Sequence, residues 1–123
     1  MQEAIHVLTV DDSASMRALL GAALTSRGYV VTQAEDGIAA LEWLESENNN
    51  VDVIVTDINM PRLDGFGLIE RLRAQPRFRD FPIIVLSTES CNEKKARASG
   101  ATGWIVKPFE ADKLNMALRR VTH

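Results

Sequence analysis

Short apolar runs alternate with segments of helical spacing along the whole chain, and this alternation constrains the fold more than any other feature. Five runs are rich in β-branched residues and have the length of strands. We therefore predict strands at Ile5–Val10, Tyr29–Thr32, Val51–Thr56, Pro82–Leu86 and Thr102–Val106. The first, third and fourth runs are almost continuously apolar, which is typical of strands buried on both faces.

Apolar residues at intervals of three and four predict amphipathic helices between and after these strands. The apolar stripes cover Met16–Leu24, Ile38–Leu44, Phe66–Leu72 and Leu114–Val121. We expect Asp36 and Asp112 to cap the second and last of these helices, and Asp64-Gly65 to open the third. The segment Asn92–Ser99 has helical propensity but almost no large apolar side chain, so it gives the weakest helical pattern.

Five strands that alternate with five helices predict an α/β fold, with a parallel sheet covered on both faces and right-handed crossovers. A chain of 123 residues is long enough to bury one ordinary core. We therefore expect a single domain over residues 1–123, with no separate output domain. In sheets of this kind, ligands bind beyond the carboxyl ends of the strands.

The distribution of charge and the apolar content exclude several classes of protein. Residues 1–90 hold 7 Lys and Arg against 14 Asp and Glu, whereas residues 91–123 hold 7 against 3. An acidic body with a basic last quarter is unlike a general nucleic-acid binder, and the basic end is either a solvated surface or a face for a partner. No apolar run is long enough to span a bilayer, and the first residues do not resemble a secretory signal. The single cysteine, Cys91, cannot form an internal disulfide, which favours the cytoplasm.

Polar residues whose side chains can take part in binding or catalysis lie at the ends of four predicted strands. Asp11-Asp12 follow the first strand, Asp57 the third, Ser87 the fourth and Lys107 the fifth. Each of them alone is typical of a helix cap, a turn or a solvated side chain. Three carboxylates at one edge repel each other unless a cation joins them, and ligands that offer only oxygen suit Mg²⁺.

A lysine and a hydroxyl group at the same edge would bind the oxygens of a phosphoryl group. A carboxylate is a competent nucleophile toward phosphorus and forms an aspartyl phosphate. Asp57 is the best candidate nucleophile because it ends the central strand. Asp11 and Asp12 would then face it from the neighbouring strand as groups that hold the metal.

Four motifs occur in order, each at a predicted strand end: VDDSASMR from Val10, DINMPRLDG from Asp57, the step Ser87-Thr88-Glu89, and GWIVKPF from Gly103. With these motifs the chain resembles a response-regulator receiver domain over nearly its whole length. Within that family it is most similar to the stand-alone chemotaxis regulators. The resemblance implies a flavodoxin-like (βα)5 three-layer sandwich with a five-stranded parallel sheet in the order 2-1-3-4-5.

The resemblance also implies a metal site and a phosphorylation site. Asp57 would accept a phosphoryl group from a histidine kinase. Asp12, Asp57 and the backbone carbonyl of Asn59 would bind Mg²⁺ directly, and Asp11 would act mainly through water.

Further roles follow from the same resemblance. Ser87 and Lys107 would bind the phosphoryl group, the bond before Pro108 would be cis, and Trp104 would be the aromatic residue that moves inward when Ser87 moves. A core or edge-strand role for Trp104 is the alternative. Asn59, Thr88 and Glu89 occupy positions that tune the lifetime of the phosphoryl group in the family.

The chain departs from the family pattern in two places. Lys107 follows Ser87 after 20 residues, slightly fewer than is usual for chemotaxis regulators, and the shortening falls in the weak fourth helix. That helix, with the fifth strand and fifth helix, forms the usual output face of the family. The β-branched Thr88 stands where a smaller residue is common, and it could narrow access to the phosphoryl group.

Three functions remain open from the sequence. The first is phosphorylation-dependent binding of a monomeric switch to a flagellar-motor switch protein. The second is a shuttle or sink that passes on or drains the phosphoryl group and has no motor output. The third is a phosphohydrolase with an aspartate nucleophile, which would need an Asp-x-Asp motif where this chain has Asp11-Asp12-Ser13. We therefore expect a switch rather than an enzyme, although it would catalyse its own phosphorylation and dephosphorylation.

Overall fold

The computed structural model describes residues 4–46, 50–87 and 93–122. The strands are β1 (His6–Val10), β2 (Val30–Ala34), β3 (Val53–Asp57), β4 (Ile83–Ser87) and β5 (Gly103–Val106). The helices are α1 (Ala14–Thr25), α2 (Gly37–Glu45), α3 (Gly65–Arg73), α4 (Glu93–Ser99) and α5 (Ala111–Val121). A short 3-10 helix, Pro76–Phe78, precedes β4 and was absent from the sequence prediction.

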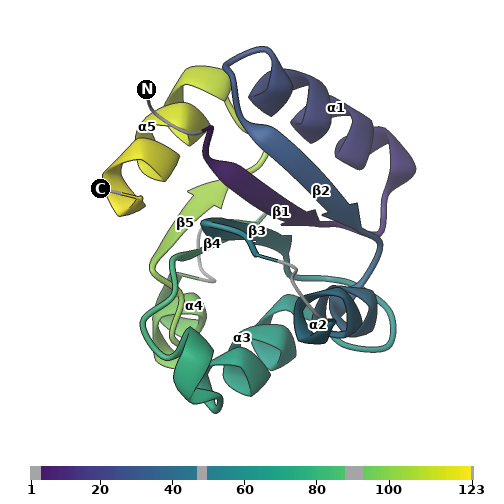
Figure 1. The fold of residues 1–123 in the computed structure, drawn as a ribbon, viewed down its shortest axis with the longest axis vertical. Helices are drawn as coiled ribbons and strands as arrows, with labels where there is room; N and C mark the ends of the chain where they lie inside the picture. Colours follow the sequence, from purple (N-terminus) through teal and green to yellow (C-terminus); the bar gives the residue numbers. More distant parts are fainter. Residues whose placement is uncertain (1–3, 47–49, 88–92, 123) are drawn as a thin grey trace.

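The five strands form one parallel sheet in the order β2-β1-β3-β4-β5. Helices α1 and α5 cover one face of this sheet, and α2, α3 and α4 cover the other (Figure 1). The predicted α/β fold, its three layers and the strand order are therefore confirmed. In the part of the chain that the structure describes, no helix has the length and apolar character needed to cross a membrane.

Each face of the sheet has its own apolar core, and consecutive strand residues contribute to opposite cores. In β4, Ile83 and Val85 pack toward α2 and α3, whereas Ile84 and Leu86 pack toward α1 and α5. All four side chains are at most 1% exposed. Burial on both faces explains why this strand is a continuous apolar run rather than an alternating one.

The helix caps agree with the sequence at two predicted positions. The Asp36 side chain accepts a hydrogen bond from the backbone N–H of Ala39 at the start of α2, at 2.8 Å. Asp64 opens α3 in the same way, by accepting from the N–H of Gly67 at 2.7 Å. Ser13 caps α1, although the sequence analysis did not assign it that role. These caps satisfy backbone donors that have no partner within the helix.

The predicted cap of the last helix was wrong. The residue before α5 is Glu110, whose side chain makes no capping hydrogen bond, and the helix begins at Ala111. Asp112 therefore lies inside the first turn, where it forms an ion pair with Arg27. A carboxylate in the first turn is still favourable because it faces the positive end of the helix dipole.

Three strands, β2, β3 and β4, extend slightly further toward their carboxyl ends than the apolar runs predicted. β3 includes Asp57, whose Cα pairs with that of Leu86, and β4 includes Ser87, which pairs with Val106. Polar residues can end a strand when backbone hydrogen bonding continues past the apolar run. Because Asp57 and Ser87 belong to the sheet itself, their backbones have fixed positions at its edge.

Arg73 joins several segments at the opposite edge of the sheet. Its guanidinium group donates hydrogen bonds to the carbonyl oxygens of Phe78 at 2.7 Å, Phe81 at 2.6 Å and Gly100 at 3.0 Å. Gly100 has a φ of 103°, which a glycine adopts without strain. Arg73 thus ties the end of α3 to the segments that lead into β4 and β5.

The imidazole of His6 and the indole of Trp43 make structural contacts away from the acidic edge. The imidazole Nε2 of His6 lies 2.7 Å from the hydroxyl oxygen of Thr32 on the adjacent strand. Trp43, on α2, packs against the core on that side of the sheet and makes an edge contact with His6. Neither residue lies at the edge where the strands end in carboxylates.

Candidate functional site

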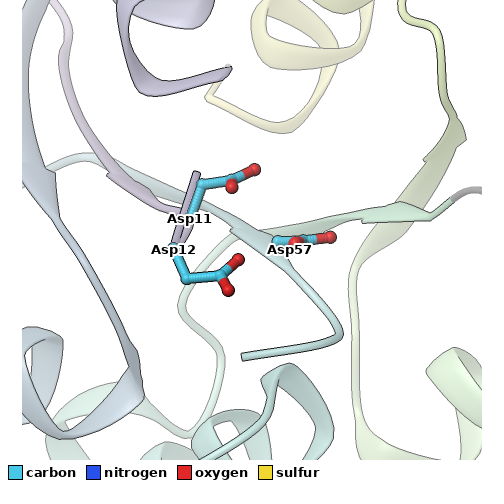
Figure 2. Close-up of side chains that lie close together, drawn as sticks. All are labelled: Asp11, Asp12 and Asp57. Carbon is cyan, nitrogen blue, oxygen red and sulfur yellow. The ribbon is translucent and has the colours of Figure 1, made fainter. Parts of the chain in front are cut away.

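Three aspartates meet at the carboxyl edge of the sheet. Asp11 and Asp12 follow β1, Asp57 ends β3, and these two strands are direct neighbours. One carboxylate oxygen from each residue lies within 4.8 Å of the others. Asp11 is buried, Asp57 is partly buried and Asp12 is exposed. Figure 2 shows the three side chains extending into the same space, so a bound ion could be reached from solvent past Asp12.

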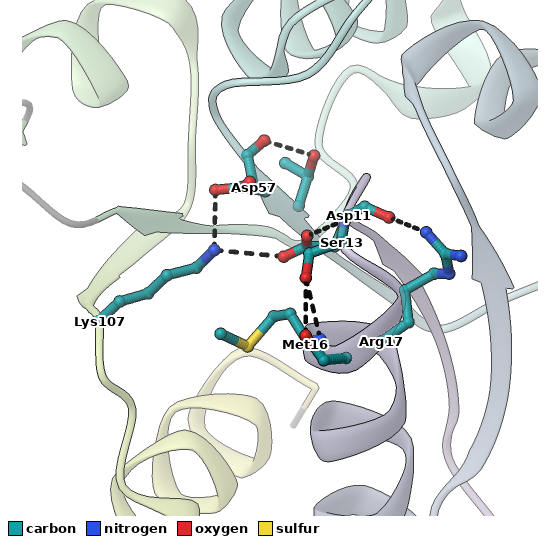
Figure 3. A network of polar contacts seen from close by, with 8 residues as sticks. Asp11, Ser13, Met16, Arg17, Asp57 and Lys107 are labelled. Carbon is teal, nitrogen blue, oxygen red and sulfur yellow. Dashed lines mark hydrogen bonds and ion pairs between the residues drawn. The ribbon is translucent and has the colours of Figure 1, made fainter.

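Lys107 brings a positive charge to the same site from the end of β5. Its Nζ lies 3.0 Å from Oδ1 of Asp57 and 3.2 Å from Oδ2 of Asp11 (Figure 3). The Lys107 side chain is only 11% exposed. Its backbone N–H donates to the carbonyl oxygen of Ser87 at 2.6 Å, and the peptide bond to Pro108 is cis, as expected. The ammonium group therefore bridges two of the three carboxylates.

The turn after β1 is held by its own hydrogen bonds. Oδ1 of Asp11 accepts from the backbone N–H of Ser13 at 2.9 Å. Nη1 of Arg17 donates to the carbonyl oxygen of Asp11 at 2.7 Å (Figure 3). These contacts fix one oxygen of the Asp11 carboxylate, while its other oxygen faces Lys107.

Burial and the neighbouring charges have opposing effects on the pKa values of Asp57 and Lys107. Burial raises the pKa of the Asp57 carboxyl, the hydrogen bond and charge of Lys107 lower it, and Asp11 raises it again, with a net increase. Burial would lower the pKa of the Lys107 ammonium, but the hydrogen bonds and charges of Asp57 and Asp11 raise it overall. Lys107 therefore stays charged, and Asp57 lies where an additional cation would favour its ionised form.

The donor set fits a hard divalent cation such as Mg²⁺. All three side chains offer oxygen, and among the described residues only the ammonium group of Lys107 pairs with them, so the carboxylates are in excess. Mg²⁺ prefers carboxylate and carbonyl oxygens and retains several water molecules, which an exposed ligand such as Asp12 allows. Asn59, whose carbonyl was predicted to be a ligand, lies exposed in the loop that follows β3.

Ser87 and Trp104 lie close to this edge on the last two strands. Ser87 ends β4 and is 2% exposed. Trp104 pairs with Val85 across the β4–β5 ladder and packs partly buried against the core on the α2–α4 face. Its indole Nε1 is buried, with no hydrogen-bond partner among the described residues. The packing of Trp104 is therefore compatible with both roles that the sequence left open.

Three residues of interest lie outside the described part of the chain. They are Thr88 and Glu89, predicted to tune phosphoryl lifetime, and Cys91.

The sequence analysis missed one contact close to the site. Arg62, in the loop between β3 and α3, forms a two-point ion pair with Asp36 at the start of α2. The two residues are 26 positions apart, and only the packing of α2 beside α3 brings them together. The one signal in the sequence was that Asp36 is a carboxylate expected at a helix start.

A parallel three-layer sandwich with the strand order β2-β1-β3-β4-β5 and an acidic, lysine-bearing edge places the chain in the class of flavodoxin-like domains. Comparison with known proteins places the chain within that class. The family model of the response regulator receiver domain matches residues 7–119. The chain belongs to the response regulator receiver domain family.

Individual relatives agree with this assignment. The gliding motility regulatory protein of Myxococcus xanthus is 39% identical over 121 residues, which are 96% of this chain but 15% of that protein. The structure of the chemotaxis response regulator CheY4 of Vibrio cholerae is 41% identical, with a TM-score of 0.86 and coverage of 97% of this chain and 99% of that one.

A third relative holds a metal ion. It is the receiver domain of the sensor histidine kinase PA1611 from Pseudomonas aeruginosa, which has a magnesium ion coordinated in the active site cleft. It is 30% identical, with a TM-score of 0.87 and coverage of 98% of both chains. Receiver domains are signalling proteins of two-component systems, not conventional enzymes, and this chain is a CheY-like member.

Proposed function

We propose that the chain is a phosphorylation switch in which Asp57 accepts a phosphoryl group from a histidine kinase. The observation that carries this proposal is the convergence of three carboxylates with one ammonium group. Their oxygens lie within 4.8 Å of one another, and the Lys107 nitrogen lies 3.0 Å from Asp57. An acidic cluster alone would suit a cation only, whereas the added lysine suits the oxygens of a phosphoryl group.

The metal side of the site would be formed by Asp12, Asp57 and the backbone carbonyl of Asn59, with Asp11 acting through water. When bound, Mg²⁺ supplies a positive charge that neutralises the transferring phosphoryl group and fixes its position. The magnesium ion in the related PA1611 receiver domain supports this assignment.

In the transfer step, a carboxylate oxygen of Asp57 attacks the phosphorus of a phosphohistidine. The new P–O bond forms as the P–N bond breaks, and the leaving imidazole nitrogen keeps the electron pair and is protonated from solvent. Lys107 would pair with the charge on the phosphoryl oxygens, and Ser87 would donate a hydrogen bond to one of them. Hydrolysis by water returns Asp57 to its free carboxylate, so the chain catalyses steps on itself only.

Phosphorylation would alter the balance between two conformations. It adds about 1.5 to 2 negative charges at an edge that already has excess carboxylate. Ser87 and Lys107 would reorganise toward that charge, and Trp104 would move with them as the aromatic switch. A partner then senses the population of the second conformation. Asn59, Thr88 and Glu89 would set how long the phosphoryl group persists.

The output that we favour is phosphorylation-dependent binding to a protein partner such as a flagellar-motor switch protein. The likeness to CheY4 of Vibrio cholerae supports this output. The proposal takes residues 1–123 as a single domain that acts as a monomer in the cytoplasm, without binding nucleic acid or inserting into a membrane. The alternative is a phosphate shuttle or sink with no motor output. The short interval of 20 residues between Ser87 and Lys107 favours this alternative, because it shortens the segment that holds α4.

Phosphorylation is tested with the purified chain, Mg²⁺ and acetyl phosphate, followed by intact mass. We expect one added phosphoryl group on the wild type, none on Asp57→Asn, and a normal yield on the matched surface variant Asp80→Asn, whose side chain is exposed. Chelation of Mg²⁺ should abolish labelling. Equal labelling of Asp57→Asn and wild type would refute the proposed acceptor.

The two outputs are separated by what the phosphorylated chain does next. Binding to a purified flagellar-motor switch protein that increases with beryllofluoride, an acyl-phosphate mimic, would support motor output. Rapid return of the phosphoryl group to a histidine-containing domain, without such binding, would support the shuttle or sink.

A further inference from the structure

The loop between β3 and α3 is fastened to the start of α2 by one ion pair. Nε of Arg62 donates to Oδ2 of Asp36, and Nη2 donates to Oδ1, both at 2.9 Å. Two parallel hydrogen bonds from one guanidinium group fix both the distance and the orientation of their partner. We call this pair the Asp36–Arg62 clamp.

Both residues of the Asp36–Arg62 clamp have features that an ordinary solvent-exposed ion pair lacks. The Asp36 side chain is 7% exposed, and it also caps α2 through the N–H of Ala39. The hydrogen bond from Arg62 is the main cause that lowers the pKa of the Asp36 carboxyl. Arg62 has a φ of 68°, a backbone conformation that is unfavourable for most residues other than glycine. Its side chain is 53% exposed and contributes little to the core.

The segment that leads to Asp36 also contacts the turn after β1, which carries Asp11 and Asp12. The backbone N–H of Asp11 donates to the carbonyl oxygen of Ala34 at 3.1 Å. Gly37, the first residue of α2, lies so close to Leu63 that a Cβ on Gly37 would be 2.7 Å from the Leu63 carbonyl oxygen. The stretch from the end of β2 to the start of α2 therefore touches both the turn after β1 and the loop after β3.

The other end of the β3–α3 loop is fixed at the sheet. The N–H of Gly65 donates to the carbonyl oxygen of Ile58 at 2.8 Å, and Gly65 packs directly against the carbonyl oxygen of Asp57. Asn59 thus lies in a loop whose two ends are joined by the hydrogen bond from Gly65 to Ile58 and whose middle is held at Arg62 by the clamp. Loss of the clamp would free the part of the loop that contains the Asn59 carbonyl.

We propose that Arg62 is a positioning residue for the metal site. Through its ion pair with Asp36 it holds the Asn59 carbonyl where this group can bind the same ion as the carboxylates of Asp12 and Asp57. It thereby sets the affinity of the site for Mg²⁺. This inference rests on the proposed function, because it takes Asn59 as a metal ligand. Removal of a group that orients metal ligands from outside the site typically weakens metal binding by about 10-fold or more. Arg62 would act on the Asn59 carbonyl only indirectly, through Asp36 and the loop, so we expect a smaller loss of affinity, of about 5-fold.

The direction of the change in Mg²⁺ affinity distinguishes a positioning role from a direct effect of the charge on each residue. Removal of the positive charge of Arg62 would, by electrostatics alone, tighten the binding of a cation. Removal of the negative charge of Asp36 would, by the same reasoning, weaken it. A positioning role instead predicts weaker binding for both changes. It also predicts that the double change is no worse than either single one, because the clamp is lost only once.

The experiment is calorimetric titration of Mg²⁺ into the wild type, Arg62→Asn, Asp36→Asn and the double variant. Asparagine suits position 62 because it tolerates a positive φ. We expect a dissociation constant about 5-fold higher in all three variants, and no change in Arg71→Gln, an exposed arginine on α3. Wild-type or tighter binding by Arg62→Asn would overturn the inference, as would additive effects in the double variant.

A kinetic split excludes a merely structural role. Phosphorylation of Arg62→Asn by acetyl phosphate should be slow at low Mg²⁺ and should reach the wild-type rate at saturating Mg²⁺. A rate that stays low at saturation would contradict a role in metal affinity. If Asp36→Asn does not fold, the Arg62→Asn titration still decides the question. Failure of the wild type to bind Mg²⁺ would overturn the proposed function together with this inference, whereas normal wild-type binding with an unaffected Arg62→Asn overturns the inference alone.

Discussion

Replacement of Lys107 by methionine tests the electrostatic description of the site. Methionine keeps a flexible side chain of similar length but removes the ammonium group that lies 3.0 Å from Asp57 and 3.2 Å from Asp11. Both carboxylates are then left without this counter-charge in a largely buried position, with side chains 13% and 1% exposed. The variant should therefore be less stable than the wild type in the absence of metal.

The size of the loss follows from two opposing contributions. At about 3 Å and an effective dielectric constant of about 20, each ion pair contributes about 5 kcal/mol of attraction, which the desolvation of the lysine largely offsets. Removal of one partner from a buried ion pair costs about 3–5 kcal/mol. Exposed ion pairs contribute only about 0–1 kcal/mol, so access of water at the edge of the sheet should reduce the expected loss of unfolding free energy to about 2 kcal/mol. With an unfolding entropy of about 2.1 cal/mol/K per residue, a domain of this size should lose about 8 °C in Tm.

The assay is thermal unfolding at pH 7, with and without saturating Mg²⁺. A bound divalent cation would replace the missing charge, so the deficit of Lys107→Met should shrink by more than half in Mg²⁺. Lys113→Met is the control, because Lys113 is 72% exposed and lies 4.0 Å from its nearest carboxylate oxygen. An unchanged Tm without metal, or the same deficit with and without Mg²⁺, would refute the reasoning.

Three further predictions concern the clamp, the opposite edge and the switch. Because the pKa of Asp36 is lowered in the folded state, its ion pair with Arg62 should stabilise the fold above about pH 4 and lose that effect as the pH falls through the folded pKa. Asp36→Asn should therefore cost stability at pH 7 and progressively less as the pH is lowered through the folded pKa, measured by urea unfolding over a pH series. Arg73→Met leaves three carbonyl oxygens without their donor, and should cost about 2 kcal/mol or more of unfolding free energy. Trp104→Phe removes a buried N–H that has no described partner, so any loss of stability should be limited to the lost contact area.

Each of these has a clear contrary result. A stability deficit of Asp36→Asn that is independent of pH would mean that the carboxylate acts as a neutral cap only. An Arg73→Met variant as stable as the wild type would show that water replaces the guanidinium group. Destabilisation of Trp104→Phe by more than the loss of contact area would show that the indole N–H has a partner in solution.

The sequence predicted the layers of the fold because burial leaves a local pattern. Continuous apolar runs such as Ile83–Leu86 indicate a strand covered on both faces, and stripes such as Phe66–Leu72 indicate a helix on a sheet. The strand boundaries were less accurate, because backbone pairing carries β3 and β4 on to polar residues that an apolar pattern excludes.

The candidate site was predictable for a topological reason. In a parallel sheet all strands end at one edge, so residues far apart in the sequence, such as Asp11 and Lys107, must meet there. The contacts of Arg62 and Arg73 have no such rule behind them. Their partners depend on how loops pack between helices, and neither spacing nor composition encodes that packing. The predicted cap of α5 was wrong for a related reason, since Asp112 lies two residues beyond the cap position, Glu110.

The most direct test of the account is to locate the phosphoryl group on the chain. Treatment with acetyl phosphate and Mg²⁺, reduction with borohydride to trap the acyl phosphate, and peptide mass spectrometry would identify the modified residue. The account predicts a single reduced aspartate at position 57. Modification at Asp11 or Asp12 instead, or no acyl phosphate on a chain that binds Mg²⁺, would contradict it.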